Sequence, residues 1–210
     1  MSKKKKSYQR GDRFTQKARD EGFAARSVYK LQEIQRRARI LAPGQRVVDL
    51  GCYPGSWADW TIRKVGKKGL VVGVDFTAPE LPGGTWLEQS VYDVRAQDIL
   101  EALGEHADVV LSDMAPRTTG ARDADHYVQI ELARRALELA VAIGKPGSSF
   151  VCKVFEGQDA RDFQTACQAH YKCRRIRPEA VRANSREWFL VGTQKKTAPL
   201  PWPPQEQDAG

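Results

Sequence analysis

The segment "VVDLGCYPGSWADW", residues 47–60, places a glycine-containing loop directly after an apolar, β-branched run. Gly51, Pro54 and Gly55 suit a tight turn at the end of a strand, where open α/β sheets bind their ligands. A P-loop needs G-x-x-x-x-G-K-[ST], but Gly55 is followed by "SW", so no lysine reaches a terminal phosphate. A dinucleotide-binding loop needs G-x-G-x-x-G, whereas this loop reads G-x-x-x-G with a proline inside it. The loop therefore predicts a ligand with an adenosine end and no phosphate.

Asp75 adds a second chemical group to this site. It closes the next apolar run, 24 residues after Gly51, close to the spacing of about 20 residues at which a carboxylate accepts hydrogen bonds from a ribose. Taken alone, Asp75 is equally compatible with a loop cap. Carboxylates attract a cationic sulfonium and repel a pyrophosphate. The loop and Asp75 together indicate S-adenosylmethionine as the cofactor.

The elements that must position these groups alternate along the chain. Apolar residues at helical spacing predict a helix over residues 24–41, ended by "APG", and further helices over 124–144 and 159–170. Short β-branched runs predict strands over 46–51, 69–75, 85–91, 107–113, 148–155, 171–177 and 186–194. Strands that alternate with helices favour an α/β fold with a mostly parallel sheet covered by helices on both faces.

Length and hydropathy predict one soluble domain. The chain has 210 residues, of which 41% are hydrophobic, enough for a single core. No apolar run approaches the roughly 20 residues of a membrane span, and the charged start lacks the apolar stretch of a signal peptide. We expect a cytoplasmic protein with a basic, partly disordered arm over 1–22, a domain over 23–195 and a disordered, proline-rich tail over 196–210.

Charge is concentrated at the amino terminus. The net charge is +8, and residues 1–41 carry 13 basic and four acidic residues, so the remainder is close to neutral. A basic arm on a neutral body is typical of proteins that attract a polyanion such as RNA. A second basic stretch lies at 171–186. For Lys3 to Lys6 alone, a solvated tail that aids solubility is the alternative.

The four cysteines, Cys52, Cys152, Cys167 and Cys173, form no C-x-x-C pair, and of the three histidines only His170, between Cys167 and Cys173, lies near them in sequence. The pattern therefore indicates no metal site and no disulfide framework, and small buried or surface thiols are expected.

The chain resembles the FtsJ/RrmJ (RlmE) family of ribosomal RNA large-subunit 2′-O-ribose methyltransferases. The resemblance extends from about residue 7 to residue 194, with order and spacing preserved in "ARSVYKLQEI", "VVDLGCYPGSW", "VVGVD", "LSDMAP", "SFVCKVFEG" and "SREWFLV". It implies a Rossmann-like, S-adenosylmethionine-dependent methyltransferase with a seven-stranded, mostly parallel sheet and an antiparallel last strand. The chain departs from the family where "GCYPGSW" replaces a form closer to "GAAPGGW", so that Tyr53 is bulkier than the usual alanine.

Matching these motifs residue by residue implies two sets of site residues. A catalytic Lys-Asp-Lys-Glu tetrad falls on Lys30, Asp113, Lys153 and Glu187. The cofactor pocket falls on Gly55, Trp57, Asp75, Asp93 and Asp113.

Each tetrad residue also stands out by its place in the predicted elements. Lys153 interrupts an apolar strand that a parallel sheet would bury, and lysine is rarely buried unless paired. Asp113 ends a strand at the same edge, although a turn-forming aspartate is the simpler interpretation. Glu187 reaches that edge if the last strand is antiparallel. Lys30 lies at the flank of its helix's apolar stripe, where a solvated lysine would be the default.

Methyl transfer to a ribose 2′-hydroxyl requires in-line approach and removal of a proton from a weakly acidic alcohol. A neutral amine can accept that proton, and burial or a second cation tunes a lysine toward neutrality. We assign this role to Lys153, with Lys30 as the second cation and Asp113 and Glu187 as orienting groups. In an alternative division, Lys153 only steers the hydroxyl and positioning supplies most of the rate.

The resemblance points to large-subunit ribosomal RNA as partner, at or near the assembled subunit stage, with a uridine expected at the target and the protein expected to be a monomer. A 2′-hydroxyl acceptor means RNA rather than DNA. Transfer RNA or another RNA remains an alternative substrate, and a non-catalytic RNA-binding assembly factor is the alternative from another class.

Overall fold

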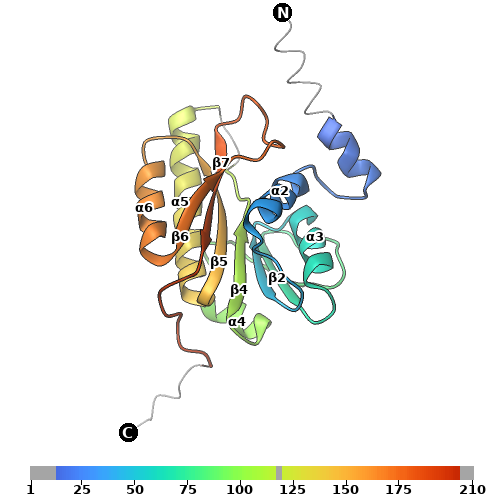
Figure 1. Cartoon of the computed structure of the whole chain (residues 1–210), viewed down its shortest axis with the longest axis vertical. Helices are drawn as coiled ribbons and strands as arrows, with labels where there is room; N and C mark the ends of the chain where they lie inside the picture. Colours follow the sequence, from blue (N-terminus) through green and yellow to red (C-terminus); the bar gives the residue numbers. More distant parts are fainter. Residues whose placement is uncertain (1–12, 117–119, 204–210) are drawn as a thin grey trace, which may run out of the picture.

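A computed structural model describes residues 13–116 and 120–203. Its centre is a seven-stranded sheet in the order β3-β2-β1-β4-β5-β7-β6 (Figure 1). β7 pairs antiparallel with both β5 and β6, and the other neighbouring strands pair parallel. The strands are β1 Arg46–Leu50, β2 Leu70–Asp75, β3 Thr85–Glu88, β4 Ala107–Ser112, β5 Gly144–Phe155, β6 Lys172–Ile176 and β7 Glu187–Thr193.

The central strands are apolar because helices cover both of their faces. Val48 of β1 lies between Val72 of β2 and Val110 of β4, and all three side chains are fully buried. A strand buried on both faces reads as a continuous β-branched run rather than an alternating one. This accounts for the "VV" pairs that recur in β1, β2 and β4.

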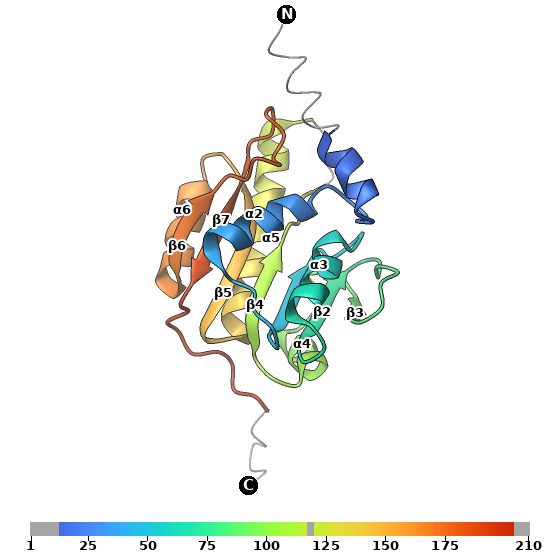
Figure 2. The ribbon, with the colours of Figure 1, turned by 45° about the vertical axis from the view of Figure 1, so that its right-hand side comes forward.

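Two helical layers enclose the sheet (Figure 2). One apolar cluster packs α4, α5 and α6 against one face, and a second packs α2, α3 and part of the helix at residues 13–20 against the other. The helices are α2 Val28–Ala38, α3 Ser56–Val65, α4 Ala96–Leu103, α5 Arg122–Ile143 and α6 Ala160–His170. None of them is both long and apolar enough to cross a membrane.

The predicted α/β fold with its antiparallel strand is confirmed. The structure adds α3, α4 and the helix at residues 13–20, for which the sequence pattern predicts no range, and other differences lie at element ends. The helix predicted over 24–41 is shorter because Arg39 adopts a left-handed conformation with φ of 52°. Ile40 and Leu41 still pack in the core as extended chain, held by two hydrogen bonds between Gln35 and the backbone of Leu41. The apolar pattern of a sequence reports which residues are buried. Here Ile40 and Leu41 are buried although the helix has already ended at Ala38.

The prediction of a disordered tail over 196–210 is wrong for residues 196–203. The Leu200 amide donates to the Ala142 carbonyl at 2.9 Å, and the Leu200 carbonyl lies 2.8 Å from His106 Nε2. Trp202 packs against the core cluster of α4, α5 and α6. One tryptophan supplies enough apolar area to order a proline-rich segment. Residues 204–210, and Lys3 to Lys6 of the basic arm, lie outside the described residues.

Candidate active site

We call the carboxyl ends of β1, β2, β4 and β5, with the adjoining first residue of β7, the rim. Parallel strands end together, and β7 runs the other way, so its amino-terminal Glu187 lies opposite Phe155 at the end of β5. Residues far apart in sequence therefore meet at one edge of the sheet.

The four tetrad residues converge at this rim. Lys30 Nζ lies 2.7 Å from Glu187 Oε1 and 3.6 Å from Asp113 Oδ1. Lys153 Nζ lies 3.2 Å from the same Asp113 Oδ1 and donates to the Asp113 carbonyl at 2.5 Å. The side chains are 6 to 17% exposed. Two ammonium groups and two carboxylates thus form one nearly closed cluster.

Asp113 Oδ1 is the centre of the cluster. It lies between the two ammonium groups, yet it is buried and makes no hydrogen bond of good geometry among the described residues. A buried acceptor without a hydrogen bond costs free energy, so such atoms are concentrated at sites that bind something. Asp113 therefore keeps an acceptor for a ligand or substrate hydroxyl.

Lys30 keeps its positive charge in this setting. Burial alone would lower the pKa of its ammonium group, but the charges of Asp113 and Glu187, and the hydrogen bond to Glu187, outweigh burial and raise the pKa above its usual value. Lys30 is consequently a fixed cation at neutral pH, which is the role assigned to it from the sequence.

The start of α2, which carries Lys30, is anchored to α3. The Trp57 indole N–H donates to the Ser27 carbonyl at 2.9 Å, and the Ser27 and Ser56 hydroxyls are 2.9 Å apart. Trp57 also packs against Phe189, whose ring centroid lies 5.6 Å from Lys30 Nζ. These contacts set the position of Lys30 relative to β7.

The side chain of Trp57 therefore belongs to the core, since it is only 3% exposed. Its place in the cofactor pocket stays a prediction for its backbone amide in the first turn of α3. The side chain of Asp93 is exposed in the turn that follows β3. In the same connection, the Gln89 amide donates to the Asp75 carbonyl at 3.0 Å. In the described residues no contact joins the Asp93 carboxylate to the rim.

The glycine loop is tied to the neighbouring strands. The Gly51 amide donates to the Val74 carbonyl at 2.8 Å, and Asp75 Oδ2 accepts from the Tyr53 amide at 3.0 Å. Gly51 has a φ of +78°, and a Cβ on it would lie 2.4 Å from Met114 Cγ. Gly55, with φ of +105°, directly precedes α3. Both positions require glycine, and the loop packs closely against the segment that follows Asp113.

Asp49 is a rim residue that our sequence analysis did not select. It is 1% exposed on β1, and its Oδ2 has no hydrogen-bond partner in the described part of the chain. Burial, followed by the charges of Asp113 and Asp75, raises the pKa of its carboxyl to about 8. The signal was present in the sequence, because an aspartate inside "RVVDL" interrupts a strand expected to be buried.

Gln129 is the second residue missed from the sequence. It lies on α5, is 1% exposed, and donates to the Lys153 carbonyl at 2.6 Å while accepting from the Phe155 amide at 2.9 Å. The pattern of residues along a helix does not show that one of its glutamines hydrogen-bonds to the backbone of a strand. Only the packing of α5 on β5 reveals it.

A seven-stranded sheet of this order, with a glycine loop after β1 and an acidic rim, defines an α/β protein of the Rossmann-like methyltransferase class. The family model of the FtsJ-like methyltransferases matches residues 23–195. The chain belongs to this family, and its members are S-adenosylmethionine-dependent methyltransferases.

Curated relatives match along nearly the whole chain. The ribosomal RNA large subunit methyltransferase E of Desulfatibacillum aliphaticivorans is 42% identical over 199 residues, which covers 93% of this chain and 96% of that protein. The protein of the same name from Sorangium cellulosum is 44% identical over 205 residues, with 93% of each chain covered. A crystal structure of a ribosomal RNA methyltransferase from Plasmodium falciparum shares the fold, with a TM-score of 0.72 at 22% identity over 82% of this chain and 98% of that one.

The residues at the rim fit S-adenosylmethionine. Asp49 Oδ2 is a buried acceptor without a partner in the described structure, and Asp75 and Asp113 are the charges that act on it. A cationic sulfonium is the kind of ligand that such a concentration of carboxylates stabilises. The two glycines of the loop, Gly51 and Gly55, carry no side chain, and glycine is the residue that lets a backbone approach a neighbour or a ligand closely.

Proposed function

We propose that this protein transfers a methyl group from S-adenosylmethionine to the ribose 2′-hydroxyl of a nucleotide, expected to be uridine, in large-subunit ribosomal RNA at or near the assembled subunit stage. The observation that carries this proposal is the convergence of Lys30, Asp113, Lys153 and Glu187 beside the glycine loop and Asp75. The names of the curated relatives support the choice of RNA.

The cofactor supplies an electrophilic methyl group when it is bound. We propose that the backbone of Gly55 and Trp57 and the carboxylates of Asp75 and Asp113 hold it, as expected from the sequence, and we add Asp49. Asp93, whose side chain is exposed in the turn that follows β3, stays in the proposed cofactor site on the resemblance alone.

In the proposed mechanism, the tetrad prepares the acceptor hydroxyl. After it has released a proton to solvent, Lys153 accepts the hydroxyl proton at Nζ as a neutral amine, and Asp113 Oδ1, which lies between the two lysine nitrogens, orients the hydroxyl. Lys30 retains its charge and holds Glu187 and Asp113 in place. General-base assistance of this kind contributes about 10²- to 10⁴-fold to a rate, and exact placement of the reacting atoms contributes the rest.

We propose that the protein acts as a monomer in the cytoplasm, where ribosomal subunits are available. The strand at one edge of the sheet supports the monomer: β6 has the sequence "KCRRI", and charged residues on an edge strand oppose pairing with a second sheet. The basic arm and the arginines near β6 and β7 support a polyanionic partner.

The experiment is transfer of radiolabelled methyl groups to large subunits purified from cells that lack the gene, followed by mapping of 2′-O-methyl sites. We expect label in large-subunit RNA at one position. Label in transfer RNA instead would show a different substrate. Binding to subunits without any transfer, by fully folded protein, would favour the assembly factor.

A further inference from the structure

A groove follows the β6 edge of the sheet, next to the rim. It consists of two adjoining hollows of about 640 and about 470 Å³ that share Glu156 and Arg175, volumes in the range of ligand-binding pockets. We call it the edge groove. Its defining residues are Glu156, Arg161, Arg175, Arg177, Arg186 and Trp188.

The edge groove begins beside the tetrad. Phe155 and Glu187 pair across β5 and β7, and the next residues, Glu156 and Arg186, are joined by a 2.9 Å hydrogen bond from the Glu156 amide to the Arg186 carbonyl. Because side chains alternate along a strand, Glu187 faces α2 while Trp188 faces the opposite layer. A polymer whose ribose lies at the tetrad can therefore continue over this edge.

The charge of the edge groove suits a polyanion. Four arginines and two acidic residues, Glu156 and Asp162, line the two hollows. Arg177 donates to the carbonyls of Ser185 and Glu187 at 2.6 and 2.7 Å, which fixes its positive charge at the start of β7. The chain segment that forms this wall is thus held in shape before any ligand binds.

Arg175 is the arginine of the edge groove that can most readily exchange its present partner for a phosphate. It forms an ion pair with Glu156, with side chains 46% and 53% exposed respectively. An exposed pair of this kind contributes little to stability. A backbone phosphate carries the same single negative charge as a carboxylate and can accept two parallel hydrogen bonds from a guanidinium. Glu156 therefore occupies the place on Arg175 that a phosphate can take.

Trp188 provides a second, independent observation. Its indole is 3% exposed, with the Arg175 guanidinium carbon 3.9 Å from the ring centroid. Trp188 lines the groove, and its indole N–H is buried with no hydrogen-bond partner in the residues that the structure describes. A buried donor that stays unpaired costs free energy. A movement of Arg175 toward a phosphate would open both the ring face and the N–H to a nucleotide.

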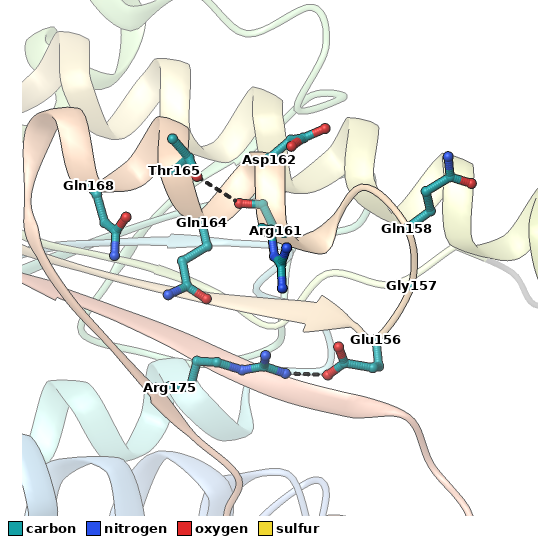
Figure 3. A pocket seen from close by; sticks show the side chains of 9 residues that line it. All are labelled: Glu156, Gly157, Gln158, Arg161, Asp162, Gln164, Thr165, Gln168 and Arg175. Carbon is teal, nitrogen blue, oxygen red and sulfur yellow. Dashed lines mark hydrogen bonds and ion pairs between the residues drawn. The ribbon is translucent and has the colours of Figure 1, made fainter.

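The opposite wall carries amides as well as charge. Arg161, Gln164 and Gln168 recur at helical spacing on α6, and Figure 3 shows them projecting toward the strand that carries Arg175. Amide side chains donate and accept, so they can bond to the edges of unpaired bases, while the arginines bind phosphates.

We propose that the edge groove binds the single-stranded RNA segment that flanks the methylated ribose, with a backbone phosphate replacing Glu156 on Arg175. This inference rests on the proposed function, because it takes RNA as the substrate. It adds a binding surface of phosphate, stacking and amide contacts that extends from Glu187 along β6 and α6.

Two substitutions that should change the affinity for large subunits in opposite directions test this proposal. Arg175→Gln should weaken binding to large subunits from cells lacking the gene by about 10-fold and lower the slope of log affinity against log salt by about one. Glu156→Gln should tighten binding about threefold, since it frees Arg175 and removes a repulsion. If the ion pair has only a structural role, the two variants change affinity in the same direction or not at all, and that result overturns the proposal.

Arg134→Gln is the matched control. Arg134 is also exposed and paired with a neighbouring glutamate, at 2.8 Å, but lies on α5 outside the groove. It should leave affinity and salt slope unchanged. Arg161→Gln gives a second variant on the other wall, expected to weaken binding in the same way as Arg175→Gln. Melting temperatures within about 2 °C of the native protein establish folding, as expected for surface substitutions.

Methyl transfer is measured separately, so the two failures can be told apart. Native protein that binds subunits without methylating them contradicts the proposed function, while the Arg175→Gln comparison still decides the groove. Native protein that methylates RNA, with an unchanged KM in Arg175→Gln and Arg161→Gln, contradicts the groove alone. Absence of any subunit binding by the native protein contradicts both.

Discussion

The side-chain amide of Gln129 on α5 bridges the Lys153 carbonyl and the Phe155 amide, at 2.6 and 2.9 Å. The ladder between β4 and β5 ends at the pair Ser112 and Cys152, so these two backbone groups extend beyond it. Gln129 takes the place of the missing strand and keeps the backbone around Lys153 extended. A helix on one face of the sheet thus holds the catalytic lysine proposed for the rim.

This relationship predicts that Gln129→Leu lowers both stability and turnover. Two buried backbone groups lose their partners, which should cost about 2 kcal/mol and lower Tm by about 4–8 °C. We expect kcat to fall about 10-fold or more, with KM for the subunit and Kd for S-adenosylmethionine nearly unchanged.

Gln97→Leu, at an exposed site on α4, is the control. Gln129→Glu keeps the acceptor for Phe155 and should recover part of the stability. Loss of Tm without loss of kcat in Gln129→Leu, measured below the melting transition, would restrict Gln129 to folding.

Lys153→Ala should reduce single-turnover methyl transfer by about 10²- to 10⁴-fold, since the group proposed to accept the proton is gone. Cofactor affinity, measured by calorimetry, should stay within about twofold because Lys153 contacts Asp113 and not the glycine loop. Lys153→Arg, which keeps the charge but cannot act as a base at neutral pH, separates the two roles. Methylation retained by Lys153→Arg would leave Lys153 only the steering role.

The buried carboxyl of Asp49 leads us to predict that the stability of the protein depends on pH. Its folded-state pKa of about 8 lies above the unfolded value, so folding favours the protonated carboxyl. The stability that this group contributes is full below the unfolded pKa of about 4 and is lost as pH rises toward 8. Without cofactor, Asp49→Asn should therefore raise Tm by about 3–6 °C at pH 8 and by less than about 1 °C at pH 5.

The exposed Asp20→Asn serves as the control and should show no such change between the two pH values. Asp49→Asn should also weaken binding of the sulfonium cofactor, because the neutral amide cannot provide a negative charge. An equal Tm gain at both pH values would mean that Asp49 is already ionised at pH 5.

The position of Phe76 leads us to predict that its ring contacts the adenine of the cofactor. It directly follows Asp75 and is 77% exposed, an unusual position for a large aromatic side chain. Stacking of a base on an aromatic ring contributes about 1–3 kcal/mol, so Phe76→Ala should raise the cofactor Kd about 10-fold. Tyr127→Ala, at an aromatic residue on α5 that is 63% exposed, should leave that Kd unchanged. A cofactor Kd that is the same for Phe76→Ala and native protein would exclude the contact.

Element types were predictable from the sequence because burial on both faces of a parallel sheet leaves a local signature. Buried segments are indicated by the "VV" runs of β1, β2 and β4. The lysine within "SFVCKVF" indicates where a buried strand is interrupted. Motif spacing then supplied the family and the identity of the tetrad. The helix end at Arg39 and the packing of Trp202 were not predicted, because a left-handed helix end and the packing of a tail depend on contacts with distant residues.

By itself, then, the sequence determined the α/β class, the cofactor loop and which four side chains carry the proposed chemistry. Only the tertiary structure decided how they meet: Lys30 touches Glu187 because Trp57 ties α2 to α3 and because β7 runs antiparallel. It also decided that Gln129 serves Lys153 and that Asp49 is buried without a hydrogen-bond partner in the described structure. The physical reason is that residue type and period report local burial, whereas distances, partners and pKa shifts arise from packing between segments remote in sequence.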